Sequence, residues 1–263
     1  MKDNEIKLQE TYEWERKTHY SDYSKILGYY QALSVIEKTV RGGRLLDVAC
    51  GDGFITGILA VHFQHVVGID ASKNHLEKAK KNYPSIQFYH SLLEDYITSE
   101  KFDVITMFNI LEHVIDPINV INKMTKLLAT DGRIIIHVPN ANAVNRKIAV
   151  LMGTLLKCEE LSPFDINVVG HRRSYTMDSL TKDVQLAGLK VTYTGGVFYK
   201  MLSTSQMDWF LKNGLWEEGG FGWGRVEEEK RKDWKMEFCK ACYEYGKAVP
   251  EECNIIYVIA EKG

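Results

Sequence analysis

The sequence predicts an α/β fold built on a mostly parallel β-sheet. From residue 44 to about 140, short apolar strand patterns alternate with helix patterns, which is typical of strands joined by crossover helices. The chain has 263 residues, of which 45% are hydrophobic and 26% charged, so it is long enough for one large domain with a substantial core. A loop of small residues follows the first strand pattern, and such loops commonly hold nucleotides.

The expected elements follow one another in a regular order. Strands are predicted at 44–48, 65–70, 85–90, 102–108 and 132–138. Helices are predicted at 54–63, at 72–83, and from Asp116-Pro117 to about Ala129. Ser72 is a natural N-cap for the second helix, and Asp116 with Pro117 supplies an N-cap and a proline at the first helical position of the third.

After residue 140 the pattern is less regular. It indicates a helix within 140–156, a loop at 158–175, a helix from Thr176 to about Leu186, and strands at 189–199 and 254–261. More than fifty residues separate these last two strands, and they are rich in Trp, Lys and Glu. We interpret them as a mostly helical insertion with a mobile glycine turn at 219–224.

Composition and charge exclude several classes of partner. The net charge of −2 gives no electrostatic reason to expect nucleic acid or an anionic membrane. The charged N-terminus does not resemble a signal peptide, and no apolar run approaches the roughly 20 residues that span a bilayer. Five cysteines, an odd number, indicate reduced thiols in the cytoplasm. Cys239 and Cys242 lie one helical turn apart and lack the second pair that a zinc site needs.

The loop in LLDVACGDGF (45–54) favours a cationic ligand over a dinucleotide. The dinucleotide fingerprint needs a third glycine where Thr56 stands, and Gly57 comes one residue too late. Asp47 and Asp52 would also face two phosphates unfavourably. S-adenosylmethionine has a sulfonium and an ammonium group and no phosphate, so an acid at the strand end suits it.

Asp70 ends the second strand, 23 residues after Asp47. A carboxylate at this place can accept hydrogen bonds from both hydroxyls of an adenosine ribose, in NAD and in S-adenosylmethionine alike. The alternative role, capping the next helix, is already filled by Ser72. Asp70 therefore predicts an adenosine ribose without choosing between the two cofactors.

Several motifs together resemble class I S-adenosylmethionine-dependent methyltransferases. LLDVACGDGF is similar to the first motif of that family, VVGIDAS to the second and FDVITMFNILEHVIDP to the fourth, and GRIIIHVPN resembles the strand that follows. The pattern LEHV-x-DP, the later PN and H-x-x-S-Y-T resemble the small-molecule branch related to quinone-biosynthesis O-methyltransferases. The likeness covers about 150 residues well. The last seventy residues are more loosely similar to sugar and secondary-metabolite enzymes.

The resemblance implies a Rossmann-like, seven-stranded, mostly parallel sheet whose last strand, at 254–261, is antiparallel and lies beside the sixth. We expect residues 41–198 and 251–263 to form the methyltransferase core, residues 1–40 an N-terminal helical cap, and residues 199–250 a helical insertion. In relatives, a segment like the cap folds over the cofactor. The candidates in its aromatic stretch are Tyr12, Arg16, His19 and Tyr20, with Arg16 suited to the methionine carboxylate. The alternative is a helix that packs these aromatic side chains on the core.

The resemblance also implies contacts to the methionine part of S-adenosylmethionine. Asp47 and the backbone at Ala49 and Gly51 would hold the ammonium group and the sulfonium side. Asn109, at the tip of the fourth strand, would lie beside the methionine portion. Ala49 replaces a glycine of the family motif, and its one methyl group narrows the pocket slightly.

Further implied contacts involve the adenosine. Asp70 would bind the ribose and Ala71 would lie beside the adenine. Leu92, Leu93 and Glu94 would frame the adenine ring. Many relatives have an Asp at the position of Leu92 that bonds the adenine amino group, so the chain departs from the family there.

The fourth motif excludes some relatives and offers a candidate base. DNA adenine and glutamine methyltransferases have N-P-P-Y or D-P-P-Y where this chain has Asn109-Ile110-Leu111. His113 comes just past the strand tip, and histidine is suited to deprotonating a hydroxyl near neutral pH. His171 is the second candidate base. The alternatives are a packed histidine at 113 and a loop cap at 171, and Glu112, about 100° away on a helix, is expected to be structural.

We expect no metal. Quinone-type relatives can bind magnesium through E-x-x-E-H, but Asn109 occupies the first position here and leaves only Glu112 and His113. Arg172 and Arg173 could bind an anionic acceptor, although solvated loop arginines are the simpler interpretation.

The insertion is predicted to cover an acceptor pocket. A hairpin between the last two strands needs only two to five residues, and the connection must leave from the carboxyl edge, where ligands bind. Its aromatic residues (Trp209, Phe210, Trp216, Phe221, Trp223) suit such a lid. The alternative is a dimer interface, and we expect a monomer or a homodimer.

The sequence thus predicts an enzyme that moves a methyl group from S-adenosylmethionine to a hydroxyl, or less readily an amine, of a small polar metabolite such as a sugar derivative or natural product. The competing hypothesis is a non-catalytic S-adenosylmethionine-binding protein with a regulatory or scaffold role. An NAD-linked oxidoreductase is the third hypothesis, and it is disfavoured because the third glycine of the dinucleotide fingerprint is out of register.

Overall fold

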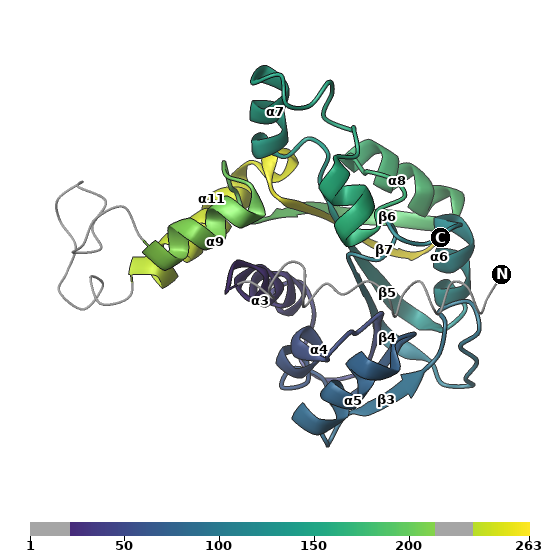
Figure 1. Ribbon diagram of the computed structural model, residues 1–263. Helices are drawn as coiled ribbons and strands as arrows, with labels where there is room; N and C mark the ends of the chain where they lie inside the picture. Colours follow the sequence, from purple (N-terminus) through teal and green to yellow (C-terminus); the bar gives the residue numbers. More distant parts are fainter. Residues whose placement is uncertain (1–21, 214–233) are drawn as a thin grey trace.

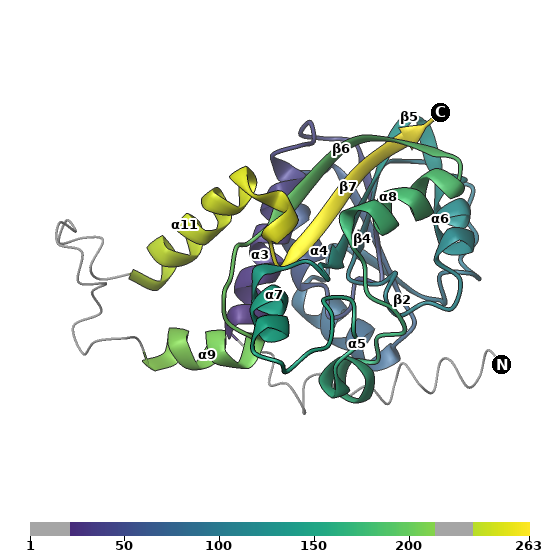
Figure 2. The ribbon, with the colours of Figure 1, turned by 90° about the horizontal axis from the view of Figure 1, so that it is seen from above.

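A seven-stranded sheet forms the centre of the computed structural model, which describes residues 22–213 and 234–263 (Figures 1 and 2). The strand order is β3-β2-β1-β4-β5-β7-β6. The first five strands pair in parallel, whereas β7 is antiparallel to both of its neighbours, β5 and β6. The predicted fold class, with a reversed last strand beside the sixth, is confirmed.

The strands are β1 (Arg44–Val48), β2 (His65–Asp70), β3 (Gln87–His90), β4 (Phe102–Phe108), β5 (Leu128–Pro139), β6 (Leu189–Val197) and β7 (Ile255–Lys262). The α-helices are α3 (Asp22–Ile36), α4 (Phe54–Leu59), α5 (Lys73–Asn82), α6 (Pro117–Thr125), α7 (Val144–Leu151), α8 (Met177–Leu186), α9 (Thr204–Asn213) and α11 (Trp234–Ala248). A π-helical turn (Asp165–Val169) and a 3-10 turn (Pro250–Glu252) complete the described elements.

Three helices begin at the predicted capping residues. Ser72 accepts a hydrogen bond from the His75 amide, and Asp116 accepts one from the Asn119 amide. Thr176 forms a capping box at the start of α8. Helix α6 is shorter than predicted because the chain already joins the sheet at Leu128, which pairs with Phe102.

Two hydrophobic clusters pack on the sheet. One contains side chains of α6 and α8, such as Ile121 and Leu180. The other contains side chains of α3, α4, α9 and α11. In it, the Tyr30 ring stacks on Tyr243 with ring centroids 4.6 Å apart, and Phe210 is buried. Both described helices of the insertion, α9 and α11, are therefore anchored in the core, although they project together beyond the sheet (Figures 1 and 2).

The chain turns sharply where three strands end. Ala49 (φ 59°), Asn109 (φ 50°) and Phe198 (φ 68°) follow β1, β4 and β6, and all three have left-handed backbone conformations that non-glycine residues seldom adopt. These turns lie at the carboxyl edge of the sheet, where the strand order reverses between β1 and β4. Ligands of open α/β sheets bind at such a switch point.

Some predictions concern residues outside the described ranges. These are Tyr12, Arg16, His19, Tyr20, the glycine turn at 219–224 and three aromatic residues of the predicted lid, Trp216, Phe221 and Trp223. Within the described ranges, none of the helices has both the length and the apolarity to cross a membrane.

Candidate active site

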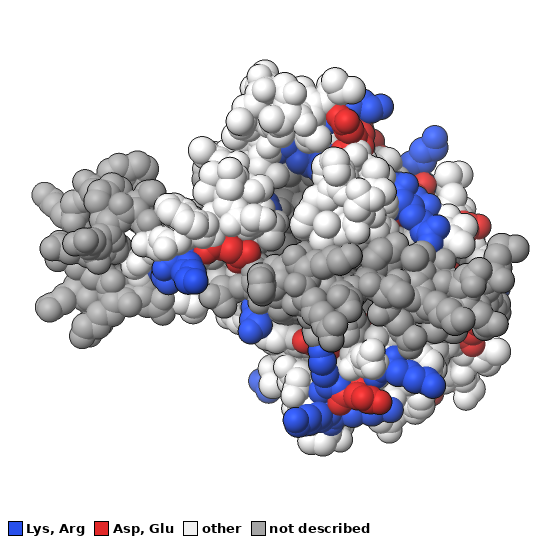
Figure 3. Space-filling model, in the orientation of Figure 1, with Lys and Arg blue, Asp and Glu red and all other residues white. Residues whose placement is uncertain are grey.

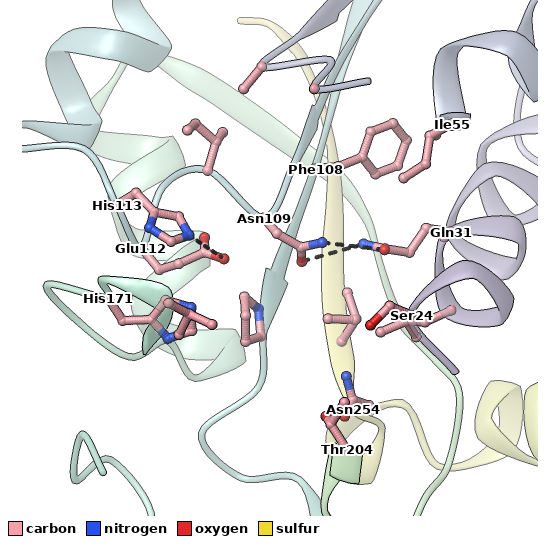
Figure 4. Close-up of a pocket in the computed structure, with 18 of the residues that line it drawn as sticks. Ser24, Gln31, Ile55, Phe108, Asn109, Glu112, His113, His171, Thr204 and Asn254 are labelled. Carbon is pink, nitrogen blue, oxygen red and sulfur yellow. Dashed lines mark hydrogen bonds and ion pairs between the residues drawn. The ribbon is translucent and has the colours of Figure 1, made fainter. Parts of the chain in front are cut away.

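A cavity of about 1210 Å³ opens along the carboxyl edge of the sheet. Its walls come from the loops after β1, β2 and β4, from α3, from residues 143–171 and from the start of α9 (Figure 4). The structure brings all the described members of the predicted site to this cavity: Asp47, Ala49, Gly51, Asp70, Ala71, Leu92, Leu93, Glu94, Asn109, His113 and His171. The side chains nevertheless differ widely in how they are held.

Asp47 is fixed by two hydroxyl groups. Its oxygens accept hydrogen bonds from Thr56 Oγ1 at 2.5 Å and Thr106 Oγ1 at 2.8 Å. Burial raises the pKa of the Asp47 carboxyl to about 6, while these two hydrogen bonds act in the opposite direction. Thr56, which occupies the place of the missing dinucleotide glycine, thus holds the acid of the first motif. A bound cation would compensate the cost of keeping this buried carboxylate charged.

Asp70 joins the ends of two neighbouring strands. Its Oδ2 accepts the Gly51 amide at 2.9 Å and its Oδ1 accepts the Ser72 amide at 2.8 Å. Each carboxylate oxygen has more than one acceptor site, so both retain capacity for ligand hydroxyl groups. The carboxylate therefore shapes the loop after β1 and presents acceptors to the cavity at the same time.

The offset glycine, Gly57, has a packing role. A Cβ atom at this position would lie 2.1 Å from the ring of Tyr83, which follows α5. Only glycine allows this close approach of α4 to the ring. Gly57 is therefore explained by helix packing, and no pyrophosphate is needed to account for it.

Asn109 lies in the middle of the cavity and pairs with a residue that the sequence analysis missed. Its side-chain amide exchanges two long hydrogen bonds, of 3.3 and 3.4 Å, with Gln31 of α3 (Figure 4). Gln31 is buried and lines the cavity. Nothing in the helical pattern of α3 separates a cavity amide from a packed one, so only the tertiary structure could identify Gln31.

Glu112, His113 and His171 form a cluster on the opposite side of the cavity (Figure 4). The rings of His113 and His171 meet edge to face with centroids 4.9 Å apart. Glu112 Oε1 lies 3.9 Å from His113 Nε2, which is too far for a hydrogen bond. The expectation that Glu112 points elsewhere on a helix is wrong, because residues 111–113 form a turn and not an α-helix.

Burial controls the protonation of this cluster. It lowers the pKa of His113 to about 3, with further lowering from His171, Arg172 and Arg173 and a raising effect from the Gly170 backbone. It raises the pKa of Glu112 to about 8, although the residue's own backbone and Arg173 act against this. Neither Glu112 carboxylate oxygen has a hydrogen-bond partner among the described residues. Near neutral pH the cluster therefore contains a neutral imidazole and an uncharged carboxylic acid.

The two arginines of the loop hold the cluster in place. Arg173 donates hydrogen bonds to the carbonyls of Leu111, Val114 and Ile115, and the Arg172 amide donates to the Glu112 carbonyl. The Arg173 guanidinium thus fixes the turn that contains His113. Arg173 therefore has a structural role. Neither of the two interpretations from the sequence, an anion-binding arginine or a solvated loop arginine, describes it.

The donor set of this cluster is a poor fit for a cation. The group of potential metal ligands found among the described residues consists of Glu112, His113 and His171, with ligand atoms within 4.8 Å of one another. The premise that the sequence leaves only two ligands, Glu112 and His113, is therefore wrong, because the fold adds His171 as a third. Two ligands of a tetrahedral Zn²⁺ lie roughly 3.3–3.5 Å apart, given bond lengths of about 2.1 Å. The separation of 3.9 Å between Glu112 and His113 is wider. The positive potential of Arg172 and Arg173 also opposes a cation.

These features define a class: a parallel sheet with a reversed last strand, and a carboxyl-edge cavity with an acid after each of β1 and β2, is the Rossmann-like arrangement of class I S-adenosylmethionine-dependent methyltransferases. A family model described as "Methyltransferase domain" matches residues 20–194. The chain therefore belongs to the methyltransferase-domain family, and S-adenosylmethionine is its cofactor.

Two curated relatives share one name. The chain is 30% identical over 170 residues to a ubiquinone biosynthesis O-methyltransferase of Aeromonas salmonicida, an alignment that covers 62% of this chain and 69% of the relative. It is 34% identical over 128 residues to the protein of the same name from Actinobacillus pleuropneumoniae, where it covers 45% of this chain and 53% of the relative. The chain thus spans between about half and two thirds of these relatives.

Solved structures share the fold at low sequence identity. The plantazolicin methyltransferase BamL, in complex with an analogue and S-adenosylhomocysteine, is 16% identical with a TM-score of 0.58, covering all of this chain and 91% of that one. An S-adenosylmethionine-dependent methyltransferase of Mesorhizobium loti is 14% identical with a TM-score of 0.56, covering 89% and 98%.

Proposed function

We propose that this methyltransferase acts on a hydroxyl oxygen of a small polar metabolite, with His113 as the proton acceptor. The observation that carries the proposal is the position of His113, which is neutral, lines the cavity just past β4, and lies in a turn held by Arg173. The names of the curated relatives support oxygen as the methylated atom.

The loops after β1, β2 and β4 would hold the cofactor. Asp47 would face its ammonium group and Asp70 its ribose, while Ala71, Leu92, Leu93 and Glu94 would surround the adenine. Ala49, Gly51 and Asn109 would lie along the methionine portion, while Arg16 and Tyr20, which the sequence offers for the same part of the cofactor, lie outside the described residues. S-adenosylmethionine, when bound, supplies a methyl group that is already activated by its sulfonium. The protein is then left with positioning and proton transfer.

His113 is a weak base, and a weak base is sufficient. A hydroxyl group becomes strongly acidic as its oxygen is alkylated, so a neutral imidazole with a pKa of about 3 can take the proton late in the reaction. A histidine with the ordinary pKa of 6.5 is also mostly neutral at pH 7, so burial of His113 mainly extends the neutral form to lower pH. His171, in edge-to-face contact, keeps the ring oriented and is the alternative base.

The test combines a substrate screen with matched variants. Sugars, sugar-linked compounds and aromatic alcohols are incubated with methyl-labelled S-adenosylmethionine, and mass spectrometry locates the new methyl group on oxygen or nitrogen. His113→Gln should lower kcat by about 10²- to 10⁴-fold and leave S-adenosylhomocysteine affinity, measured by calorimetry, unchanged. His62→Gln, a histidine that bonds Thr39 outside the cavity, is the control. Tight S-adenosylhomocysteine binding with no transfer to any compound would favour a non-catalytic role, and an unchanged kcat in His113→Gln would remove His113 as the base.

A further inference from the structure

Lys200 is a buried lysine in the cavity that the reaction described above does not use. It is the one Lys or Arg side chain that is buried among the described residues, with 5% of its surface exposed. The backbone around it is fixed on both sides, because Phe198 accepts the Asn254 amide and the Tyr199 amide donates to Cys242. Its position at the cavity wall is therefore set by the sheet and by α11.

The ammonium group has few partners. Lys200 Nζ lies 3.0 Å from Thr204 Oγ1 and 4.7 Å from the ring centroid of Tyr23. Among the described residues it forms no salt bridge. Asp208, one turn further along α9, attracts it from a distance but is itself engaged, since its Oδ1 accepts the Tyr23 amide at 3.1 Å. Desolvation outweighs this attraction and lowers the pKa of Lys200 to about 7, so the cavity wall supplies too little negative charge.

The surroundings of Lys200 suit an anion. Ser203, Thr204 and Ser205 line the cavity at the beginning of α9, a ten-residue helix, and Asn254 lies beside Thr204 (Figure 4). The amino end of a helix carries partial positive charge and amide donors. One end of the cavity therefore brings together the serine and threonine hydroxyl groups, the amino end of α9 and the Lys200 ammonium group.

We propose that Lys200 and the first turn of α9 bind a carboxylate or phosphate group carried by the methyl acceptor. The proposal rests on the function proposed above and specifies its substrate class. Strand β6 is three strands away from β4, about 14 Å at roughly 4.8 Å per strand. The acceptor is therefore an acidic metabolite whose anionic group lies toward the β6 side of the cavity and whose methylated oxygen lies toward His113. Such an anion supplies the charge that Lys200 lacks.

The cavity has opposite charge preferences at its two ends. Asp47 and Asp70 lie on the β1–β2 side and suit a cationic ligand, whereas Lys200 lies on the β6 side. An acceptor with a remote anion can then enter in one orientation only. The sequence offered Arg172 and Arg173 for this role, but neither lines the cavity, and the Arg173 guanidinium is bonded to backbone carbonyls.

The experiment measures anion binding directly, without methyl transfer. The full-length protein, saturated with S-adenosylhomocysteine so that the carboxylate site of the cofactor is filled, is titrated with inorganic phosphate or acetate by calorimetry. Wild type is expected to bind at least one of them, and Lys200→Met to bind it about 10- to 100-fold more weakly, the loss expected for a charge-assisted hydrogen bond. Tighter binding of phosphate would identify a phosphate group on the acceptor, and tighter binding of acetate would identify a carboxylate.

Lys212→Met is the matched control, because Lys212 belongs to α9 and lines the same cavity but is exposed. Lys200→Gln, which keeps a polar group, repeats the test should the methionine variant fold poorly. The proposal is overturned by equal affinities in wild type and both Lys200 variants, by a loss confined to Lys212→Met, or by no binding of either anion to wild type. Anion binding that depends on Lys200 in a protein that transfers no methyl group would leave this proposal standing and count against the proposed function.

Discussion

The two sides of the cavity are built differently. On the β1–β2 side, all four carboxylate oxygens of Asp47 and Asp70 accept hydrogen bonds from the protein. On the far side, formed by residues 111–115, 143–171 and 200–213, the Glu112 carboxyl has no hydrogen-bond partner among the described residues and Lys200 has no counter-ion there. Buried polar groups are normally paired. The protein thus holds the acids of the first side in place and leaves them spare acceptor capacity, whereas on the second side two buried groups lack a partner of this kind.

The largest effect is expected at Glu112, where burial opposes charge. Its pKa is raised from 4.5 to about 8 in the folded protein, so the wild type loses stability as the pH rises through this interval. Glu112→Gln does not titrate. Its stability relative to wild type should increase between pH 5 and pH 9, by on the order of 4 kcal/mol. Urea unfolding at the two pH values measures the change.

Glu77→Gln, an exposed position on α5, is the control and should show no such trend. If the stability difference between Glu112→Gln and wild type is the same at pH 5 and pH 9, Glu112 is ionised throughout. The far side of the cavity would then contain a charge that is already compensated.

A smaller effect is expected on the paired side. Asp70→Asn retains one acceptor oxygen but loses the charge and one acceptor, so S-adenosylhomocysteine should bind about 1–3 kcal/mol more weakly. We choose asparagine rather than alanine because Asp70 also holds the Gly51 and Ser72 amides. Asp103→Asn is the control, since Asp103 accepts a backbone amide at the opposite edge of the sheet. Equal affinity in wild type and Asp70→Asn would show that Asp70 does not contact the ribose.

In the turn after β1, Ala49→Gly is expected to raise the free energy of unfolding by about 1 kcal/mol. Ala49 has φ 59°, a conformation that costs a residue with a Cβ atom roughly 1–2 kcal/mol and glycine almost nothing. Ala49→Gly should therefore raise the free energy of unfolding, after the greater entropy of glycine in the unfolded chain is subtracted. Ala60→Gly, at a right-handed position ending α4, should lower it. Destabilisation by both variants would mean that the Ala49 methyl group packs usefully.

The smallest effect is expected from removal of metals. Treatment with EDTA or phenanthroline should leave turnover unchanged, because the Glu112–His113 separation is wide and two arginines repel a cation. Activity that is lost on chelation and restored by Mg²⁺, Mn²⁺ or Zn²⁺ would show that the cluster binds metal after all.

The same division explains what could be predicted from the sequence. The β1–β2 side follows from local rules: an acid ends each strand, and the loop is built of small residues, so Asp47, Gly51 and Asp70 were found together. The far side depends on tertiary contacts. His171 reaches His113 because Arg173 holds a turn 58–62 residues away in sequence, and no local pattern reports this. Both histidines were nevertheless named as candidate bases from the sequence, and both line the cavity.

The sequence analysis expected Glu112 to be structural and did not consider Lys200, for different reasons. The helical geometry assumed for Glu112 does not apply to a turn. Lys200 stands in a stretch where a lysine is ordinarily a solvated surface residue, and its burial requires Tyr23 of α3 and Thr204 of α9 to surround it. The helix caps were predicted more closely, since they depend on neighbouring residues alone, whereas β5 begins at Leu128, four residues before the predicted strand, because Leu128 pairs with Phe102.

The anchoring of α9 and α11 has a consequence for how this enzyme can diversify. Phe210 and Tyr243 are part of the core. Replacing 205–245 by a short turn would therefore remove buried core side chains and destabilise the whole domain. Helix α7, by contrast, has no buried residue. Substitutions on α7, whose Asn145 and Arg146 line the cavity, should therefore change the acceptor range at less cost to the core than substitutions on α9.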